Sequence, residues 1–443
     1  MKKIPFATSL RGTLSVPGDK SISHRSVMLG AIAEGRTRVR GFLKSEDCLA
    51  TIECFRKMGI RIEELTGLSA HMPEADPEEA VLVIHGKGLH GLTEPDGELN
   101  AMNSGTTARL LTSILAGQPF VSRITGDESL RSRPMGRIIR PLSYMGVMCA
   151  TEDGCERLPM SVFGGEVHPV RYESPIASAQ VKSCVLLAGL YADGPTFYTE
   201  PALSRNHTEL MLGAFGGNLK VRQKQGSESV TTILYPGTIL TGQDIYVPGD
   251  ISSAAYFLAA GLIVPDSEIT IRGVGINGTR DGILRVIRAM GGDLTVENIR
   301  MEGRETVADL TVRSSELTGT DIGGALIPAL IDEIPVIAVM AACAKGTTVI
   351  RDAAELKVKE SDRLHEIVKD LRLMGIRVDE TDDGMIIRGG TLKGAKIDPG
   401  GDHRMAMAFS VAGLVSEGTT VITDEQCVNI SYPGFYEDLY SLS

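Results

Sequence analysis

Apolar and polar positions follow a pattern that recurs six times along the chain. Each copy has a polar or glycine-containing opening, an alanine-rich apolar helix, a glycine and a short β-branched strand. The copies cover residues 17–41, 103–126, 174–201, 248–274, 327–352 and 401–424. Self-similarity of this kind predicts a fold built from repeated supersecondary units.

A second element, an amphipathic helix that ends in glycine before a strand, follows in at least five copies. Its glycines are Gly59, Gly146, Gly216, Gly291 and Gly375. Glycine directly after a helix is the residue expected at a left-handed C-terminal cap. In the last of these helices, the apolar residues between Leu364 and Met374 keep helical spacing, which predicts a face packed in the core.

Together the two elements predict an α/β chain of six strand–helix–strand–helix–strand units, three in each of two similar domains. The sequence Val-Pro-Gly-Asp at residues 16–19 returns at residues 247–250 and marks the second half. We therefore expect one domain over residues 18–243. The other is expected to be discontinuous, over residues 1–17 and 244–443. The strand before Pro17 can pair with either half.

The composition is that of a globular protein, with 42% hydrophobic and 23% charged residues among 443. The net charge of −11 disfavours nucleic acid and anionic membrane as partners. The longest apolar runs, such as residues 254–264, are too short to span a bilayer. An anion-binding site in this chain must therefore be a local cluster of cations.

The chain has seven cysteines and no C-x-x-C motif, which predicts reduced thiols in the cytoplasm rather than disulfides or zinc. No H-x-x-x-H motif occurs, no G-x-G-x-x-G follows a strand, and the P-loop pattern is missing. We therefore expect neither a metal nor a nucleotide cofactor. The N-terminus has no apolar segment of the kind found in signal peptides.

The first helix opening, residues 17–25, combines a Pro-Gly turn with a cap at Asp19 or Ser21 and the cations Lys20 and Arg25. A helix N-terminus favours negative charge through its free N–H groups and its dipole. Two cations and a hydroxyl at this end therefore suggest a bound anion. The alternative is an ordinary capped helix with solvated cations.

Later openings offer similar groups. Gly105 would let backbone approach a ligand closely, and Ser178 and Gln180 are hydrogen-bonding groups at a helix start. Ordinary caps are the alternative for all three. Arg205 adds a cation beside a serine, and Arg404 follows His403 at the last opening.

Arg133 precedes Pro134, which fits the first turn of a helix. Arg133 and Arg137 would then lie one turn apart and repel each other, a cost that an anion would remove. Solvated arginines with nearby carboxylates are the alternative.

Two carboxylates are candidates for proton transfer. Asp332 lies in a strongly apolar segment, where desolvation would raise its pKa and suit a general base. It could equally cap the helix that Pro335 begins. Glu360 lies between Lys359 and Arg363, so two cations could hold an anion while Glu360 moves a proton. An ion-paired helix start is the alternative here.

Six motifs in this order resemble the 5-enolpyruvylshikimate-3-phosphate synthase family of enolpyruvyl transferases. They are P-G-D-K-S-x-S-H-R at 17–25, N-S-G-T-T-A-R at 103–109, L-R-x-R-P-M at 130–135, S-A-Q-V-K-S at 178–183, K-V-K-E-S-D-R at 357–363 and D-H-R-M-A-M at 402–407. The resemblance implies an inside-out α/β barrel with three βαβαββ units in each of two domains. It also implies an active site in the interdomain cleft.

The resemblance implies transfer of enolpyruvyl from phosphoenolpyruvate to the 5-hydroxyl of shikimate 3-phosphate, with release of phosphate, on the route to chorismate and the aromatic amino acids. Asp332, Glu360 and Lys20 would be catalytic. The residues implied for shikimate 3-phosphate are Lys20, Ser21, Arg25, Ser178, Gln180, Arg205, Asp332 and Lys359. Those implied for phosphoenolpyruvate are Lys20, Gly105, Arg133, Gln180, Arg363 and Arg404. No cofactor is implied, and we expect a cytoplasmic monomer.

The C-terminal segment departs from many relatives, because residues 427–433 contain no lysine before the Tyr-Pro pair. Together with Ser178 and Arg205, this pattern resembles the second, more divergent class, some members of which resist glyphosate. Gly105 carries no blocking side chain, so we expect glyphosate to enter.

Two rival hypotheses remain. The related UDP-N-acetylglucosamine enolpyruvyl transferases would carry a catalytic cysteine near Arg133, but residues 130–139 contain none. A non-catalytic anion-binding module would have no need of Asp332 and Glu360, which are both present.

Overall fold

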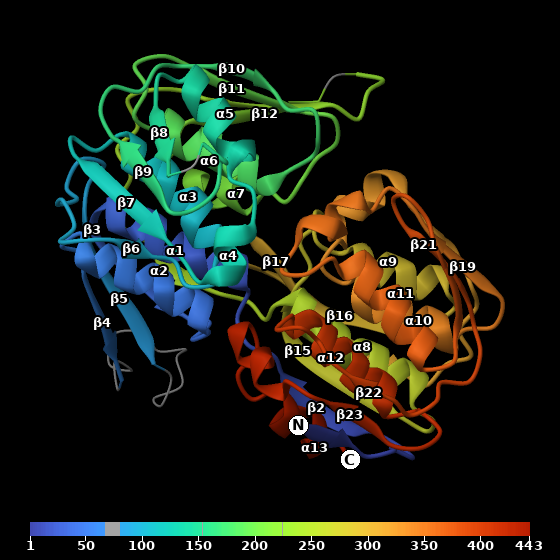
Figure 1. Ribbon diagram of the computed structural model, residues 1–443. Helices are drawn as coiled ribbons and strands as arrows, with labels where there is room; N and C mark the ends of the chain where they lie inside the picture. The colour runs from blue at the N-terminus through green and yellow to red at the C-terminus, as the bar shows by residue number, and fades with distance from the viewer. Residues whose placement is uncertain (67–79, 153, 224) are drawn as a thin grey trace. The chain divides into compact units, whose positions relative to one another are not determined.

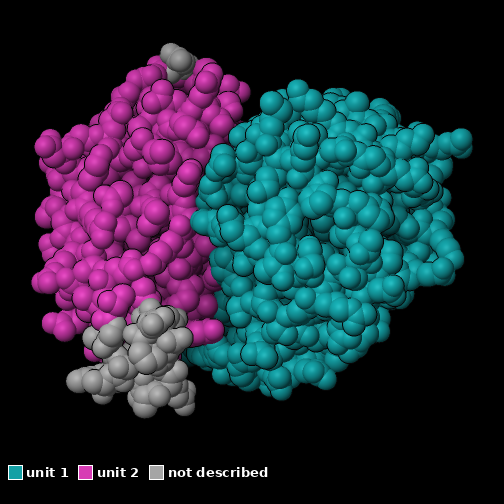
Figure 2. Space-filling view, turned by 90° about the horizontal axis from the view of Figure 1, so that it is seen from below, with its two compact units in different colours: residues 1–17, 248–443 teal, residues 18–247 magenta. Residues whose placement is uncertain are grey.

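The computed structural model describes residues 1–66, 80–152, 154–223 and 225–443. The chain divides into two compact units (Figure 2): unit 1 contains residues 1–17 and 248–443, and unit 2 contains residues 18–247. Unit 1 is therefore discontinuous in sequence, because the N-terminal segment joins the C-terminal half.

Two short strands set the limits of the units. β2 (Arg11–Ser15) pairs in parallel with β15 (Glu268–Gly275), so the segment before Pro17 belongs to unit 1. β14 (Asp244–Tyr246) pairs in parallel with β3 (Glu34–Arg40) and belongs to unit 2. Unit 2 consequently extends to residue 247, past the limit at residue 243 that the sequence suggested.

Five sheets among the described residues have four strands in one common order. The first strand pairs in parallel with the second, and the two others continue the sheet antiparallel, as β18, β19, β21 and β20 illustrate. In unit 2 the orders are β14–β3–β5–β4, β6–β7–β9–β8 and β10–β11–β13–β12. In unit 1 they are β2–β15–β17–β16 and β18–β19–β21–β20.

The remaining strands have the following bounds. In unit 2 they are β4 Arg61–Leu65, β5 Val81–Lys87, β6 Leu99–Asn100, β7 Val121–Thr125, β8 Met148–Thr151, β9 Met160–Phe163, β10 Arg171–Glu173, β11 Thr196–Glu200, β12 Leu219–Gln223 and β13 Val230–Leu234. In unit 1 they are β1 Lys2–Ile4, β16 Asp293–Glu302, β17 Glu305–Arg313, β18 Asp321–Ile322, β19 Thr347–Ile350, β20 Arg377–Glu380, β21 Met385–Arg388, β22 Lys396–Ile397 and β23 Thr420–Ile422.

The sixth sheet has three strands. β22 and β23 keep the parallel pair, and the N-terminal strand β1 pairs antiparallel with β23. In the other sheets this antiparallel place is taken by the last strand of the same repeat. The N-terminus of the chain therefore completes its final repeat.

The predicted repeat of apolar helices is confirmed. They are α1 Lys20–Ile32, α3 Gly105–Ala116 and α6 Ala179–Gly189 in unit 2, and α8 Ile251–Ile263, α10 Ile334–Cys343 and α12 His403–Gly413 in unit 1. Every residue of α12 is buried. Within unit 1, α8, α10 and α12 pack against one another, with the sheets around them (Figure 1). A helix that is apolar all round belongs in such an interior, which explains the inside-out arrangement.

The second set of helices is amphipathic, as predicted. Its members are α2 Glu46–Lys57, α5 Gly136–Tyr144, α7 His207–Ala214, α9 Gly282–Ala289 and α11 Arg363–Leu373. The glycine after each of them has a positive φ, between 78° and 98°. The five apolar residues at helical spacing in α11 and its C-cap, from Leu364 to Met374, are at most 1% exposed. Each such side chain contributes about 1.5–3 kcal/mol to stability.

The other helical segments are short: α4 Glu128–Ser132, α13 Phe435–Ser441 and the 3₁₀ helices Gly324–Ala329, Ala354–Val358 and Glu425–Ile430. Over the described ranges of the chain, the helices are all too short or too polar to cross a membrane.

Candidate active site

Lys20 is the first residue of α1, and its surroundings are fixed by two carboxylates. Asp19 caps the helix by accepting a hydrogen bond from the backbone N–H of Ile22 at 2.8 Å. Lys20 Nζ forms an ion pair with Asp47 in the first turn of α2. Asp47 was not among the predicted site residues, since no local pattern connects it with Lys20.

Arg25 is buried within unit 2 and joins three helices. Its Nε donates to Thr208 Oγ1 at 2.6 Å, and its Nη2 donates to Ser183 Oγ at 2.8 Å. A third bond runs from Nη1 to the carbonyl of Ser21 at 3.0 Å. Arg25 therefore ties the start of α1 to α6 and α7.

A hydroxyl chain links the start of α1 to that of α3. Nδ1 of buried His24 lies 2.7 Å from Thr51 Oγ1, which in turn lies 2.6 Å from Thr107 Oγ1. Thr107 donates to Ser104 Oγ, the side chain that caps α3. Burial, with Lys20 and Arg25 nearby, holds the pKa of His24 well below its ordinary value, so this histidine is neutral at pH 7.

The openings of α3 and α6 meet through Arg109. Its Nη1 donates to Gln180 Oε1 at 2.8 Å. A Cβ added to Gly105 would lie 2.9 Å from this Nη1 atom and 3.6 Å from Arg133 Nη1. Gly105, Gln180 and Arg133 are thus brought together. Arg109 was missed as a site residue, although it ends the predicted motif at residues 103–109.

The expected arrangement of Arg133 and Arg137 on one helix is wrong. Arg133 is the C-cap of α4 and has extended φ and ψ angles of −80° and 141°. The residue before a proline disfavours the helical conformation, so α5 begins only at Gly136. Arg133 instead donates from Nη2 to Asn103 Oδ1 at 2.6 Å, which places it beside the opening of α3.

Ser178 caps α6 by accepting a hydrogen bond from the backbone N–H of Val181 at 3.4 Å, so the ordinary cap interpretation holds for it. Arg205 lies in the segment between β11 and α7 and is partly exposed.

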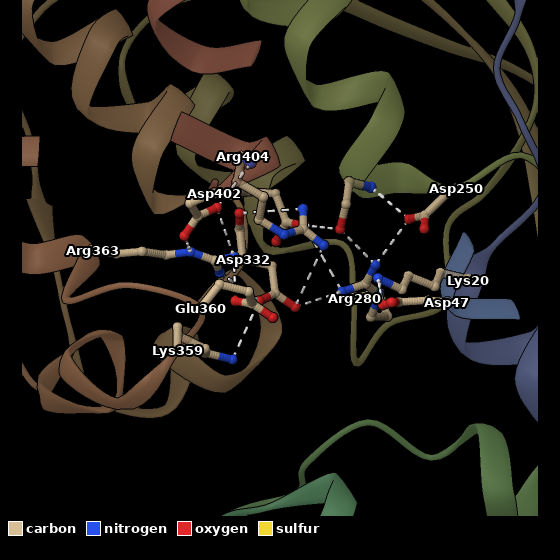
Figure 3. Close-up of polar contacts among 12 residues, drawn as sticks. Lys20, Asp47, Asp250, Arg280, Asp332, Lys359, Glu360, Arg363, Asp402 and Arg404 are labelled. Carbon is tan, nitrogen blue, oxygen red and sulfur yellow. Dashed lines mark hydrogen bonds and ion pairs between the residues drawn. The ribbon is translucent and has the colours of Figure 1, made fainter. Parts of the chain in front are cut away.

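In unit 1, four cations surround the carboxylate of Asp332 (Figure 3). Lys359 Nζ lies at 3.3 Å and Arg363 Nη1 at 3.4 Å, while Arg404 Nη2 and Arg280 Nη1 lie at 3.9 and 4.0 Å. Asp332 does not cap α10, because the N-cap of that helix is Glu333. The cations favour the charged carboxylate and so oppose the effect of burial expected from the apolar sequence.

Arg363, the first residue of α11, contacts three carboxylates. Nε donates to Asp402 Oδ2 at 2.7 Å, Nη2 to Glu360 Oε2 at 2.5 Å and Nη1 to Asp332 Oδ1 at 3.4 Å. Burial alone would lower the pKa of Arg363, but the charges of Asp402 and Glu360 outweigh it and raise the pKa. The guanidinium therefore stays charged in the interior.

Lys359 and Arg363, the two cations on either side of Glu360, lie on different elements. Lys359 is the C-cap of a 3₁₀ helix, and α11 begins four residues later at Arg363. Because the chain bends between them, both cations reach Asp332 from separate elements.

Arg404 lies in the first turn of α12. Its backbone N–H donates to the capping carboxylate of Asp402 at 3.0 Å, and its Nη1 lies 3.5 Å from the carbonyl of Asp332. Burial alone would lower the pKa of Arg404, but the nearby charge of Asp332 raises it.

Arg280 was missed by the sequence analysis. Its Nη2 donates to Asp250 Oδ1 at 3.0 Å and to Ser252 Oγ at 2.8 Å, and Ser252 Oγ donates to Glu333. Asp250 and Ser252 belong to the repeated Val-Pro-Gly-Asp opening, but nothing in the sequence points to an arginine in the loop before α9. Arg280 thereby connects the openings of α8 and α10.

The predicted site residues thus form two sets. The set in unit 2 comprises Lys20, Ser21, Arg25, Gly105, Arg133, Ser178, Gln180 and Arg205, and the set in unit 1 comprises Asp332, Lys359, Glu360, Arg363 and Arg404. Both sets lie at or next to helix openings. In the described part of the chain, no group of three or more His, Cys, Asp or Glu side chains is arranged to hold a metal ion.

Comparison with known proteins identifies the family. The model of the family described as EPSP synthase (3-phosphoshikimate 1-carboxyvinyltransferase) matches residues 6–439. A 3-phosphoshikimate 1-carboxyvinyltransferase of Desulforamulus reducens is 52% identical over 432 residues, which is 97% of this chain and 96% of the relative. One from Geobacillus kaustophilus is 50% identical over 438 residues, 98% of each chain.

A solved structure agrees with these sequences. The structure of EPSP synthase from Acinetobacter baumannii has a TM-score of 0.84 and 43% identity, and the match covers 100% of this chain and 97% of that one. These matches cover nearly the whole chain and agree with its repeated fold, and the chain belongs to the EPSP synthase family.

Proposed function

We propose that this chain is a 3-phosphoshikimate 1-carboxyvinyltransferase, which transfers the enolpyruvyl group of phosphoenolpyruvate to the 5-hydroxyl of shikimate 3-phosphate. Membership of the family over nearly the whole chain supports this activity. Both substrates are anions, which accounts for cationic helix openings in a chain of net charge −11.

The reaction is an addition followed by an elimination. The 5-hydroxyl oxygen attacks C2 of phosphoenolpyruvate, Asp332 takes the hydroxyl proton, and the C3 methylene gains a proton from Glu360 with Lys20 assisting. In the second step C3 returns a proton to Glu360 and the C2–C3 double bond forms again. The bond between C2 and the phosphate oxygen breaks, and the leaving phosphate takes the proton that Asp332 held. In the tetrahedral intermediate between the two steps, C2 carries both the 5-oxygen of shikimate 3-phosphate and the phosphate group.

The observation that carries this assignment is the shared guanidinium of Arg363, which donates to both Glu360 and Asp332. A cation bonded to both proposed proton-transfer groups can hold an anion beside them. Arg404 and Lys359, which also face Asp332, add positive charge to this set.

We propose the following binding roles. Phosphoenolpyruvate would contact Lys20, Gly105, Arg133, Gln180, Arg363 and Arg404. Shikimate 3-phosphate would contact Lys20, Ser21, Arg25, Ser178, Gln180, Arg205, Asp332 and Lys359. Two observations on Arg109 support this grouping of the unit 2 residues. Its Nη1 donates to Gln180, and it lies close to the position that an added Cβ would take at Gly105.

We also propose a cytoplasmic monomer that needs no cofactor. Burial raises the pKa of Cys48 to about 12. Such a thiol stays protonated and unreactive at neutral pH. Positioning and electrostatics are sufficient for an addition–elimination between two polar anions.

The deciding experiment measures phosphate release when the protein is mixed with shikimate 3-phosphate and phosphoenolpyruvate. Release that depends on both substrates, with enolpyruvyl found on the 5-oxygen, supports the proposal. Release only with a UDP-sugar acceptor would favour the related UDP-N-acetylglucosamine transfer, and no release with either acceptor would favour a binding module.

A further inference from the structure

A buried lysine in α6 takes no part in the proposed chemistry. Lys182 is 0% exposed and lies between Glu200 at 2.7 Å and Glu209 at 2.8 Å, both of which are also buried. Burying a charge is costly unless its partners are close and well placed. A lysine held at this depth therefore needs an explanation beyond packing.

The contacts of Lys182 converge on a single residue, Ser204. Lys182 Nζ donates to the carbonyl of Ser204 at 3.1 Å. The backbone N–H of Ser204 donates to Glu200 Oε1 at 3.1 Å, and its Oγ donates to Glu200 Oε2 at 2.6 Å. The amide, the carbonyl and the hydroxyl of Ser204 are thus all bonded to the ion pair.

Ser204 directly precedes Arg205 in the segment between β11 and α7 (Figure 1). Fixing three polar atoms of the preceding residue determines the path of the chain into Arg205. Ordering a residue costs backbone conformational entropy. A segment that is already ordered in the folded protein loses less entropy when Arg205 binds a ligand.

Arg25 is held by residues that directly follow or precede Lys182 and Glu209 in sequence. The neighbours of Lys182 and Glu209 in sequence, Ser183 and Thr208, lie 2.6 Å apart through their hydroxyls and both accept from Arg25. The hydrogen bonds of Arg25 and the ion pair of Lys182 with Glu209 thus involve adjacent residues of α6 and α7.

We propose that Lys182, through Glu200 and Ser204, is a positioning residue that holds Arg205 ready for shikimate 3-phosphate. The inference rests on the proposed function, because it assigns these residues to the acceptor substrate. A purely structural ion pair would stabilise unit 2 without affecting the affinity for either substrate.

The test uses Ser204→Ala, which removes one hydroxyl and leaves the charges in place. We expect the Kd for shikimate 3-phosphate, measured by calorimetry without phosphoenolpyruvate, to rise about three- to tenfold, the range that corresponds to one typical hydrogen bond. The KM for phosphoenolpyruvate and kcat should stay within about twofold. Lys182→Met should raise the same Kd further, and its circular dichroism spectrum shows whether it folds.

A double-mutant cycle shows whether the effect passes through Arg205. In an Arg205→Ala background, Ser204→Ala should change the Kd for shikimate 3-phosphate by less than about twofold. The matched control is Ser416→Ala in unit 1, which removes another buried hydroxyl, bonded to Gly413 and Thr420. It should lower thermal stability without changing either affinity.

An unchanged Kd in Ser204→Ala, or fully additive effects in the double variant, would overturn the positioning role. Failure of the proposed function is separate, since the unmodified protein would then release no phosphate from the two substrates.

Discussion

Asp402 and Arg363 form a buried ion pair in which Nε of the arginine donates to Oδ2 of the carboxylate at 2.7 Å. The other oxygen of Asp402 accepts the backbone N–H of Arg404 and caps α12. One carboxylate therefore fixes an arginine at the start of α11 and the first turn of α12. Both arginines proposed for phosphoenolpyruvate in unit 1 depend on it.

Substitution of Asp402→Asn should weaken the binding of phosphoenolpyruvate. The amide oxygen can still cap α12, but Arg363 loses its buried counter-charge. We expect the free energy of unfolding to fall by about 3–5 kcal/mol and the KM for phosphoenolpyruvate to rise about tenfold. Urea unfolding and steady-state kinetics provide the two measurements.

The matched control is Asp379→Asn, which breaks an exposed pair with Arg388. Exposed pairs contribute little, so both properties should stay close to those of the unmodified protein. A KM for phosphoenolpyruvate in Asp402→Asn that equals that of the control would contradict the proposed dependence of Arg363 on Asp402.

Removal of the basicity of either proposed proton-transfer group should lower turnover far more than it weakens substrate binding. Asp332→Asn and Glu360→Gln keep the shape of each side chain but remove its basicity. We expect kcat to fall about 100- to 10,000-fold in each variant. Calorimetry should show that shikimate 3-phosphate still binds.

The control for this pair is Glu366→Gln in α11, whose carboxylate pairs with Lys369 and not with Arg363. It should retain full turnover. Full activity in Asp332→Asn or in Glu360→Gln would remove the corresponding residue from the mechanism.

The repeated helices and strands could be predicted because each depends on residues that are close together in the sequence. The strand at residues 347–350 and the glycine after α11 follow from β-branching and from cap chemistry alone. The sequence also indicated which helix openings carry cations. A local pattern of this kind needs no knowledge of partners far away in the chain.

The contacts that fix the site could not be predicted, because they join distant segments. Nothing local connects Lys20 with Asp47, or Arg280 with Asp250, although both ion pairs form at helix openings. The expectation for Arg133 is wrong for a different reason, because the residue before a proline disfavours the helical conformation. The roles of these residues in binding stay predictions until tested.

A side chain at position 105 should weaken the binding of both phosphoenolpyruvate and glyphosate. In Gly105→Ala the new Cβ would lie 2.9 Å from Arg109 Nη1, closer than side chains normally approach. Arg109 must then move, which strains its bond to Gln180. We expect the KM for phosphoenolpyruvate to rise about tenfold, equivalent to about 1.4 kcal/mol, and inhibition by glyphosate to weaken.

Gly165→Ala serves as the control for this prediction, since a Cβ at that position meets nothing within 4 Å. The unmodified protein should be inhibited by glyphosate well below millimolar concentration, measured against varied phosphoenolpyruvate. Inhibition only at millimolar glyphosate would show that an open Gly105 is not sufficient for entry.

Asp370, in the last turn of α11, should make the stability of unit 1 depend on pH. Burial raises its pKa from 3.8 to about 7; Lys369 opposes this shift, and Glu366 and Asp398 add to it. The unfolded chain therefore loses this proton near pH 4, whereas the folded chain keeps it until about pH 7. Stability falls as pH rises through this window and stays at the lower level above it.

The substitution Asp370→Asn removes this pH-dependent cost. Each pKa unit corresponds to 1.36 kcal/mol, so at pH 8 the variant should gain up to about 4 kcal/mol relative to its difference at pH 4. Urea unfolding of both proteins at pH 4, 6 and 8 measures the change. Asp379→Asn, on an exposed strand, should show no such trend. The stability difference between Asp370→Asn and the unmodified protein could also stay constant across this pH range. The pKa of Asp370 would then be the same in the folded and unfolded chains, which would contradict the prediction.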